Sequence, residues 1–210
     1  PLAPEAFAAM EPWLTNGFAN PHSAHAAGRA AAAAVEVARD QVAALLPPGG
    51  RVIFTSGATE ALNLAIMGCG LPVRAVATEH AAVLDCVQHV DGELLPIRSD
   101  GLLDQVTTDA TLLAVMLVNN EIGTIQPIAH IAGLTRASGG LLLCDAVQAY
   151  GRMPIPDGPD IIAISAHKIH GPKGIGALWV RDGVSLTPQM LGGGQEQGMR
   201  SGTLSPALCA

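Results

Sequence analysis

Lys168 is the residue of this sequence best suited to act as a nucleophile. It lies in residues 165–174, which read SAHKIHGPKG and follow an apolar run. A lysine at the end of a buried strand is expected to be partly desolvated, which lowers its pKa and makes its amine nucleophilic. Such an amine can form a Schiff base with an aldehyde. Lys168 is therefore predicted to attach a cofactor covalently.

Three further groups could hold a planar, phosphorylated aldehyde. Asp145 follows another apolar run, and a buried carboxylate there would need a partner such as a protonated ring nitrogen. Residues 56–59, which read SGAT, can offer backbone N–H groups and the Thr59 hydroxyl to an anion at a helix N-terminus. His80 could stack on a planar ligand or transfer protons. Together with Lys168, these groups form the set that pyridoxal 5′-phosphate (PLP) requires.

Each of these groups also has an ordinary structural explanation. Asp145 could be the N-cap of a helix at residues 146–150, and residues 56–59 could be an ordinary helix N-cap. His80 could be a solvent-exposed turn histidine. Residues 119–123, which read NNEIG, could present an amide to a ring oxygen or could be only a turn. The prediction of a site therefore depends on their joint occurrence.

The elements that position these groups alternate between short apolar runs and amphipathic stretches from residue 50 to residue 182. This alternation predicts βα units around a mostly parallel sheet. In such sheets, ligands bind beyond the carboxyl ends of the strands, where polar residues follow five of the predicted strands. Strands are expected at residues 51–55, 73–77, 111–118, 141–144, 160–165 and 176–180, and helices at residues 26–46, 60–68, 81–89 and 128–138.

Composition narrows the possible classes of protein. Of the 210 residues, 49% are hydrophobic and 3% aromatic, which favours a large core of Ala-rich helices packed on a sheet. A net charge of −7 argues against nucleic-acid binding, and no apolar run is long enough for a membrane span. The four cysteines are widely spaced, which is typical of reduced thiols in the cytoplasm. The histidine pairs lack the partners of a zinc site, so no metal is expected.

Short motifs that carry these groups are spread over nearly the whole chain. In order they are residues 20–25 (NPHSAH) with Gly28 and Arg29, 54–60 (FTSGATE), 78–80 (TEH), 118–123 (VNNEIG), 145–148 (DAVQ), 165–174 around Lys168, 192–196 (GGGQE) and 198–203 (GMRSGT). In this order the chain resembles the cysteine desulfurases of the NifS/IscS type, within the class V aminotransferase group of PLP enzymes.

The resemblance implies a role for each matched residue. Lys168 would carry the Schiff base, and His80 would stack over the pyridine ring and assist proton transfer. Asp145 would pair with the pyridine nitrogen. The remaining residues would bind other parts of the cofactor: Gln148 and Asn120 the side of the ring oxygen, Ala58, Thr59, Ser165 and His167 the phosphate, and Thr203 the phosphate of a neighbouring subunit in a homodimer.

The resemblance also implies a fold and an activity. Residues 1–210 would form the three-layer α/β/α large domain of PLP-dependent transferase fold type I, with a mostly parallel sheet. Members of this family remove sulfur from L-cysteine, leaving L-alanine and an enzyme persulfide. The persulfide would supply iron–sulfur cluster or thio-cofactor assembly through a sulfur-acceptor or scaffold protein. We therefore expect a cytoplasmic enzyme of sulfur metabolism.

The sequence departs from the family pattern at both ends. The opening strand is absent before Pro1, and the smaller domain with the nucleophilic cysteine loop and a substrate-binding arginine would lie beyond Ala210. None of the four cysteines matches that loop. The chain is therefore interpreted as a fragment that would not desulfurate cysteine alone. The alternatives are a selenocysteine lyase, another class V PLP enzyme, or a non-catalytic subunit with the PLP fold.

Overall fold

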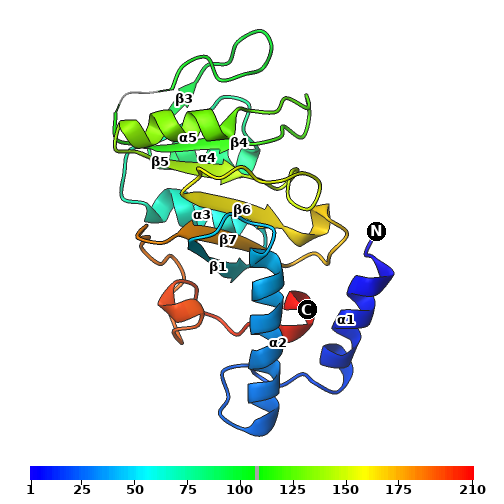
Figure 1. Ribbon diagram of the computed structural model, residues 1–210. Helices are drawn as coiled ribbons and strands as arrows, with labels where there is room; N and C mark the ends of the chain where they lie inside the picture. Colours follow the sequence, from blue (N-terminus) through cyan, green and yellow to red (C-terminus); the bar gives the residue numbers. More distant parts are fainter. Residues whose placement is uncertain (107–108) are drawn as a thin grey trace.

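A seven-stranded sheet forms the centre of the computed structural model, which describes residues 1–106 and 109–210 (Figure 1). The strand order is β1-β7-β6-β5-β4-β2-β3. β7 is antiparallel to both of its neighbours, and the other paired strands are parallel, so the predicted mostly parallel sheet is confirmed. The strands are β1 (Gly50–Thr55), β2 (Val73–Val76), β3 (Glu93–Leu95), β4 (Leu112–Met116), β5 (Leu141–Asp145), β6 (Ile161–Ser165) and β7 (Gly176–Arg181).

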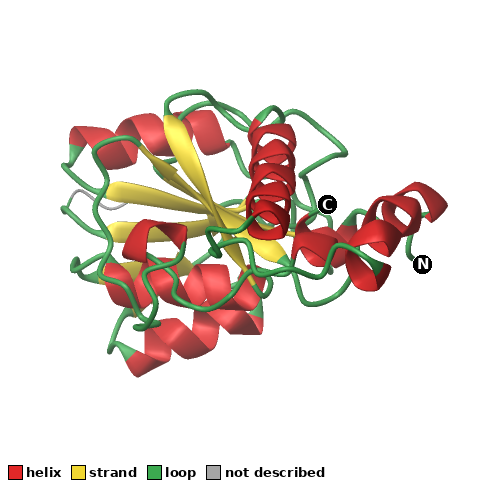
Figure 2. Cartoon of the chain, turned by 90° about the horizontal axis from the view of Figure 1, so that it is seen from below, coloured by secondary structure: helices red, strands yellow, loops and turns green. Residues whose placement is uncertain are grey.

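Helices cover both faces of this sheet (Figure 2). The core on one face contains residues of α2 and α5, and the core on the other contains residues of α3 and α4. In β6, Ile162 points to the first core, whereas Ile161 and Ala163 point to the second, because successive side chains of a strand alternate between faces. The helices are α1 (Pro4–Thr15), α2 (Ala26–Ala43), α3 (Ala58–Gly68), α4 (Ala81–His89), α5 (Ile128–Ala137) and α6 (Pro206–Cys209).

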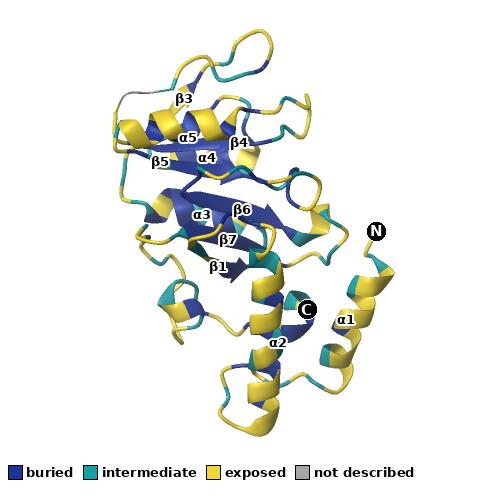
Figure 3. Cartoon of the chain, in the orientation of Figure 1, coloured by how far each residue is buried: buried dark blue, intermediate teal, exposed yellow. Residues whose placement is uncertain are grey.

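Burial on both faces explains the apolar runs of the central strands (Figure 3). Every residue of β4 and of β6 is buried. A strand covered by helices on both sides has no face that favours polar residues, so its sequence is continuously apolar. Polar groups can therefore begin only where the strand ends, which places them at the rim of the sheet.

Three of these helices and strands were not predicted: α1, β3 and the short α6. α1 begins at Pro4, a residue that is well tolerated at the start of a helix. Of the residues of α1, Met10 alone is buried, so the sequence shows little apolar periodicity there. β3 is a three-residue strand at the edge of the sheet. Every helix in the described part of the chain is too short or too polar to cross a bilayer.

Candidate active site

A cavity of about 430 Å³ lies beyond the carboxyl ends of five strands, β1, β2, β4, β5 and β6. Each of these strands is followed closely by residues that line it. The cavity thus occupies the place where ligands bind in open α/β sheets. It is lined by nine of the ten residues predicted from the sequence: Ala58, Thr59, His80, Asn120, Asp145, Gln148, Ser165, His167 and Lys168.

The loop between β1 and α3 forms one wall of the cavity. Gly57 has a φ of 155°, which favours glycine, and it immediately precedes the first turn of α3. A Cβ atom on Gly176 of β7 would lie 2.7 Å from the Gly57 Cα, so the loop packs against β7 at a point where both residues are glycine. The free N–H groups at the start of α3 border the cavity and suit a phosphate group.

Ser165 and His167 extend this wall from the end of β6. The Ser165 hydroxyl is 2.9 Å from His167 Nδ1, which fixes the orientation of the imidazole. Desolvation and the positive charges of Lys168 and Lys173 lower the pKa of His167, so the ring is mainly neutral at pH 7. Lys173 also lines the cavity, which was not predicted from the sequence. The wall therefore combines hydrogen-bond donors with positive charge.

Asp145 ends β5 with its side chain at the cavity. The residue is 4% exposed, and its Oδ1 accepts a hydrogen bond of 2.9 Å from the Val147 N–H. Burial raises the pKa of Asp145, whereas the Val147 N–H and His80 lower it. No lysine or arginine forms an ion pair with this carboxylate among the described residues. A ligand cation would therefore be strongly favoured beside it.

Glu79, next to His80, is a second buried carboxyl group, which was not predicted from the sequence. Its Oε1 accepts a hydrogen bond of 2.6 Å from the Met116 N–H, and its Oε2 has no partner within the described ranges. Burial, together with the charge of Asp145, raises the pKa of Glu79 to about 8 despite the Met116 N–H. Glu79 is thus mainly protonated at pH 7. Asp145, which lines the cavity, is the carboxylate available to a ligand.

His80 both caps a helix and lines the cavity. Its Nδ1 accepts a hydrogen bond of 3.0 Å from the Ala82 N–H at the start of α4, so the ring carries its proton on Nε2. Asn119 donates a hydrogen bond of 2.7 Å to the Thr78 carbonyl and so ties the turn after β4 to the segment that bears His80. His80 is exposed, as expected for a turn histidine, but it also caps α4 and lines the cavity.

Lys168 lies at the cavity but is exposed, so the expectation that it is partly buried at the end of a strand is wrong. The chain leaves β6 at Ser165 and enters a short 3₁₀ helix, η1 (Ala166–Lys168). This turn carries Lys168 out of the sheet to the rim. The position still suits covalent attachment, because the amine can reach a ligand in the cavity from its edge.

Thr203 is the tenth predicted residue, and it does not line this cavity. It is exposed, in the segment that follows Gly192–Gly194. That segment is connected to the β1–α3 loop: Arg200 Nε donates to Glu60 Oε1 over 2.7 Å, and Glu60 Oε2 accepts from the Ser56 N–H over 2.7 Å. The contact of Thr203 with a neighbouring subunit remains a prediction.

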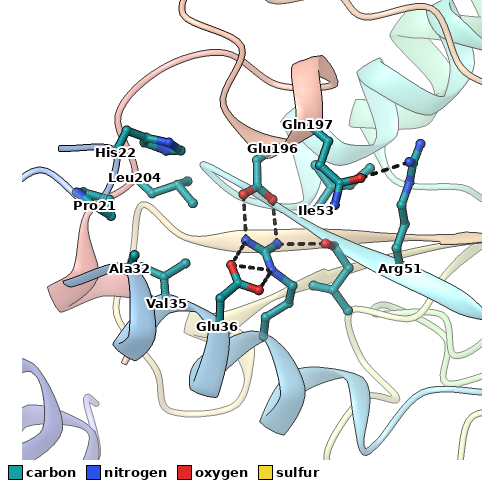
Figure 4. Close-up of a pocket in the computed structure, with 12 residues that line it drawn as sticks. Pro21, His22, Ala32, Val35, Glu36, Arg51, Ile53, Glu196, Gln197 and Leu204 are labelled. Atoms are coloured by element: carbon teal, nitrogen blue, oxygen red, sulfur yellow. Dashed lines mark hydrogen bonds and ion pairs between the residues drawn. The ribbon is translucent and has the colours of Figure 1, made fainter. Parts of the chain in front are cut away.

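A buried ion pair holds the same segment against β1 (Figure 4). The Glu196 carboxylate accepts two hydrogen bonds from Arg39 of α2, of 2.7 and 2.8 Å, and one of 2.7 Å from the Phe54 N–H. Glu196 and Gln197 have φ values of 50° and 57°, which are unfavourable for residues other than glycine. The ion pair, beside a cavity of about 280 Å³, thus stabilises a strained turn.

Similarity to known proteins identifies the family of this chain. The chain belongs to the class-V aminotransferase family, whose model ("Aminotransferase class-V") matches residues 1–205. The chain is 44% identical to "Cysteine desulfurase IscS" of Rickettsia rickettsii (strain Iowa) and 45% identical to that of Rickettsia felis (strain ATCC VR-1525 / URRWXCal2). Both alignments cover 99% of this chain and 57% of the relative, so the chain spans little more than half the length of these relatives.

Solved structures show the same fold. A structure titled "NIFS-LIKE PROTEIN" matches with a TM-score of 0.91 at 31% identity, over 99% of this chain and 64% of the other. "SspA in complex with cysteine" matches with a TM-score of 0.91 at 32% identity, over 100% of this chain and 67% of the other. The predicted α/β fold and the predicted family are both confirmed.

Proposed function

We propose that residues 1–210 are the PLP-binding large domain of a cysteine desulfurase. The observation that carries this proposal is a cavity in which Lys168, a buried carboxylate and a helix N-terminus suited to an anion meet, each from a different strand end. These groups fit PLP in chemistry: an amine for the aldehyde, a carboxylate for the ring nitrogen and N–H donors for the phosphate. The names of the relatives supply the choice of reaction.

Asp145 and His80 would have different roles toward the bound cofactor. When bound, PLP supplies an electron sink that stabilises negative charge on the α-carbon of an amino acid. Asp145 would stabilise a positive charge at the ring nitrogen, because its carboxylate is buried and the described part of the chain gives it no cationic ion-pair partner. His80, with its Nδ1 occupied by the Ala82 N–H, has Nε2 available to exchange a proton above the ring.

The phosphate would be held by Ala58, Thr59, Ser165 and His167. Ser165 and His167 already form a hydrogen bond, so their orientation needs little change on binding. Asn120 and Gln148 would lie at the ring oxygen, on the rim formed by the ends of β4 and β5. Lys168, at the edge of the cavity, would form the covalent linkage and later accept or donate a proton at its Nζ.

The whole protein would convert L-cysteine to L-alanine and pass the sulfur, as a persulfide, to an acceptor or scaffold protein of iron–sulfur cluster or thio-cofactor assembly. We place it in the cytoplasm as a homodimer, with Thr203 contacting the partner's phosphate. The names of the relatives support the reaction, and the exposure of Thr203 is compatible with contact to a second subunit.

Covalent labelling tests the proposal. The full-length protein incubated with PLP is expected to show the visible absorption band of a lysine–PLP linkage, and borohydride reduction should fix PLP on the peptide containing Lys168. Lys168→Ala should lose both signals. Lys173→Ala is the matched control, since it removes another lysine of the same cavity and should keep the band. Reduction that labels a different lysine, or no lysine, would refute the proposal.

A further inference from the structure

Arg152 connects two of the residues proposed to bind the cofactor, from outside the cavity. Its Nη1 donates to the Gln148 Oε1 over 3.2 Å, and its Nη2 donates to the Lys168 carbonyl over 2.7 Å. Gln148 follows β5 and Lys168 follows β6. Arg152 itself is exposed and does not line the cavity. The Arg152 guanidinium therefore connects the ends of β5 and β6, which border the same cavity.

The chemistry of this contact fixes the orientation of an amide. A guanidinium carries only donors, whereas a carboxamide has an acceptor oxygen and a donor NH₂ group. The oxygen of Gln148 must therefore face Arg152, which leaves the NH₂ group of Gln148 available to donate elsewhere. Gln148 lines the cavity, so this group is a donor suited to an anionic oxygen there.

The second hydrogen bond holds the backbone that carries the reactive lysine. Lys168 is the last residue of the 3₁₀ helix η1, and two residues later His170 has a φ of 64°. Its bond to Arg152 is charge-assisted and short. The planar fork of an arginine can make both contacts at once, which a lysine ammonium on a flexible stem cannot do with the same geometry.

We propose that Arg152 is a positioning residue for the cofactor site: it orients Gln148 so that the amide NH₂ donates to the ring oxygen of PLP, and it holds Lys168 at a fixed distance from that amide. This inference rests on the proposed PLP function. A donor at the ring oxygen stabilises its deprotonated form. The pH at which the lysine–PLP linkage changes its absorption is therefore lower with Arg152 in place.

The test uses the full-length protein and a spectroscopic pH titration of the PLP band. Arg152→Met should raise the midpoint of the titration by about one pH unit, which corresponds to a tenfold change in proton affinity. PLP binding should weaken about tenfold in the same variant, as expected for loss of one charge-oriented hydrogen bond. Arg152→Lys, which keeps the charge, should recover part of both effects. Arg98→Met is the control, because Arg98 is also exposed but pairs with Asp100.

A double-variant comparison separates positioning from a general structural role. If Arg152 acts through the amide, Arg152→Met should shift the midpoint little further in a Gln148→Leu background. An unchanged midpoint in Arg152→Met, or an equal shift with and without Gln148, would overturn the inference. These outcomes differ from failure of the proposed function, in which the wild-type protein itself would show no lysine–PLP band.

Discussion

Replacing Glu79 by glutamine isolates the free-energy cost of ionising a buried carboxyl group. Burial and the neighbouring Asp145 raise the pKa of Glu79 from 4.5 to about 8. The pKa therefore rises by about 3.5 units. At about 1.4 kcal/mol for each unit, ionising Glu79 costs at most about 5 kcal/mol more in the folded chain than in the unfolded chain. Between these two pKa values the folded state binds more protons than the unfolded state, so the free energy of unfolding falls as the pH rises.

The amide introduced by Glu79→Gln would keep the hydrogen bond from the Met116 N–H through its oxygen but cannot ionise. We therefore compare the free energies of unfolding of Glu79→Gln and wild type, measured in urea without PLP. The difference between them is expected to shift by about 3 kcal/mol in favour of the variant from pH 5 to pH 8. Burying the NH₂ group of the glutamine costs the same free energy at both pH values, so this cost cancels in the comparison of pH 5 with pH 8. Glu121→Gln, at an exposed position, serves as the control. A Glu79→Gln difference that is equal at both pH values would refute the reasoning.

Four further outcomes are expected. Cys69 and Cys209 should react slowly with thiol reagents at pH 7, because burial raises the pKa of both thiols, that of Cys209 to about 12; fast labelling of the folded protein would contradict this. Residues 1–210 expressed alone should release no sulfide from L-cysteine, since none of the residues described as lining the 430 Å³ cavity is a cysteine; sulfide release at the rate of a full-length relative would show otherwise. Glu196→Gln should lower the free energy of unfolding in urea by about 2 kcal/mol, because it removes the charge paired with Arg39; a change near zero would count against this role. Gly176→Ala should weaken PLP binding about tenfold, because its Cβ would lie 2.6 Å from the Ile164 carbonyl and press on Gly57; unchanged PLP affinity in a fluorescence titration would exclude that effect.

Most strands of this fold could be predicted from the sequence, because the residues that mark the end of a strand lie next to it in the chain. The end of an apolar run indicates the end of a buried strand. His80, Asp145 and Ser165 lie at or shortly after such ends, so their positions at the rim of the sheet could be predicted. The direction of β7 was not predictable in the same way, because an apolar run does not encode whether a strand runs parallel or antiparallel to its neighbours. α1 was missed because it buries only Met10, so its packing left no periodic pattern.

The contacts between distant segments were outside the reach of sequence patterns. Arg39 and Glu196 are 157 residues apart, and no spacing rule links them. The bond from Arg152 to the Lys168 carbonyl exists because β5 and β6 are adjacent, which depends on the strand order. The exposure of Lys168 was predicted wrongly for a local reason: the 3₁₀ helix that follows β6 carries the side chain away from the sheet.

The position of β7 in the sheet has a consequence for the biosynthesis of the protein. Of the seven strands, β1 leaves the ribosome first, but its partner is β7, the last of them, which lies between β1 and β6. The loop after β1 therefore cannot settle beside Ser165 until Gly176–Arg181 has been made. Until then the apolar residues of β1 lack their partner strand, as in other folds with long-range pairing. The cavity at the strand ends can therefore be completed only late in synthesis, and the apolar residues of β1 are prone to aggregation until then.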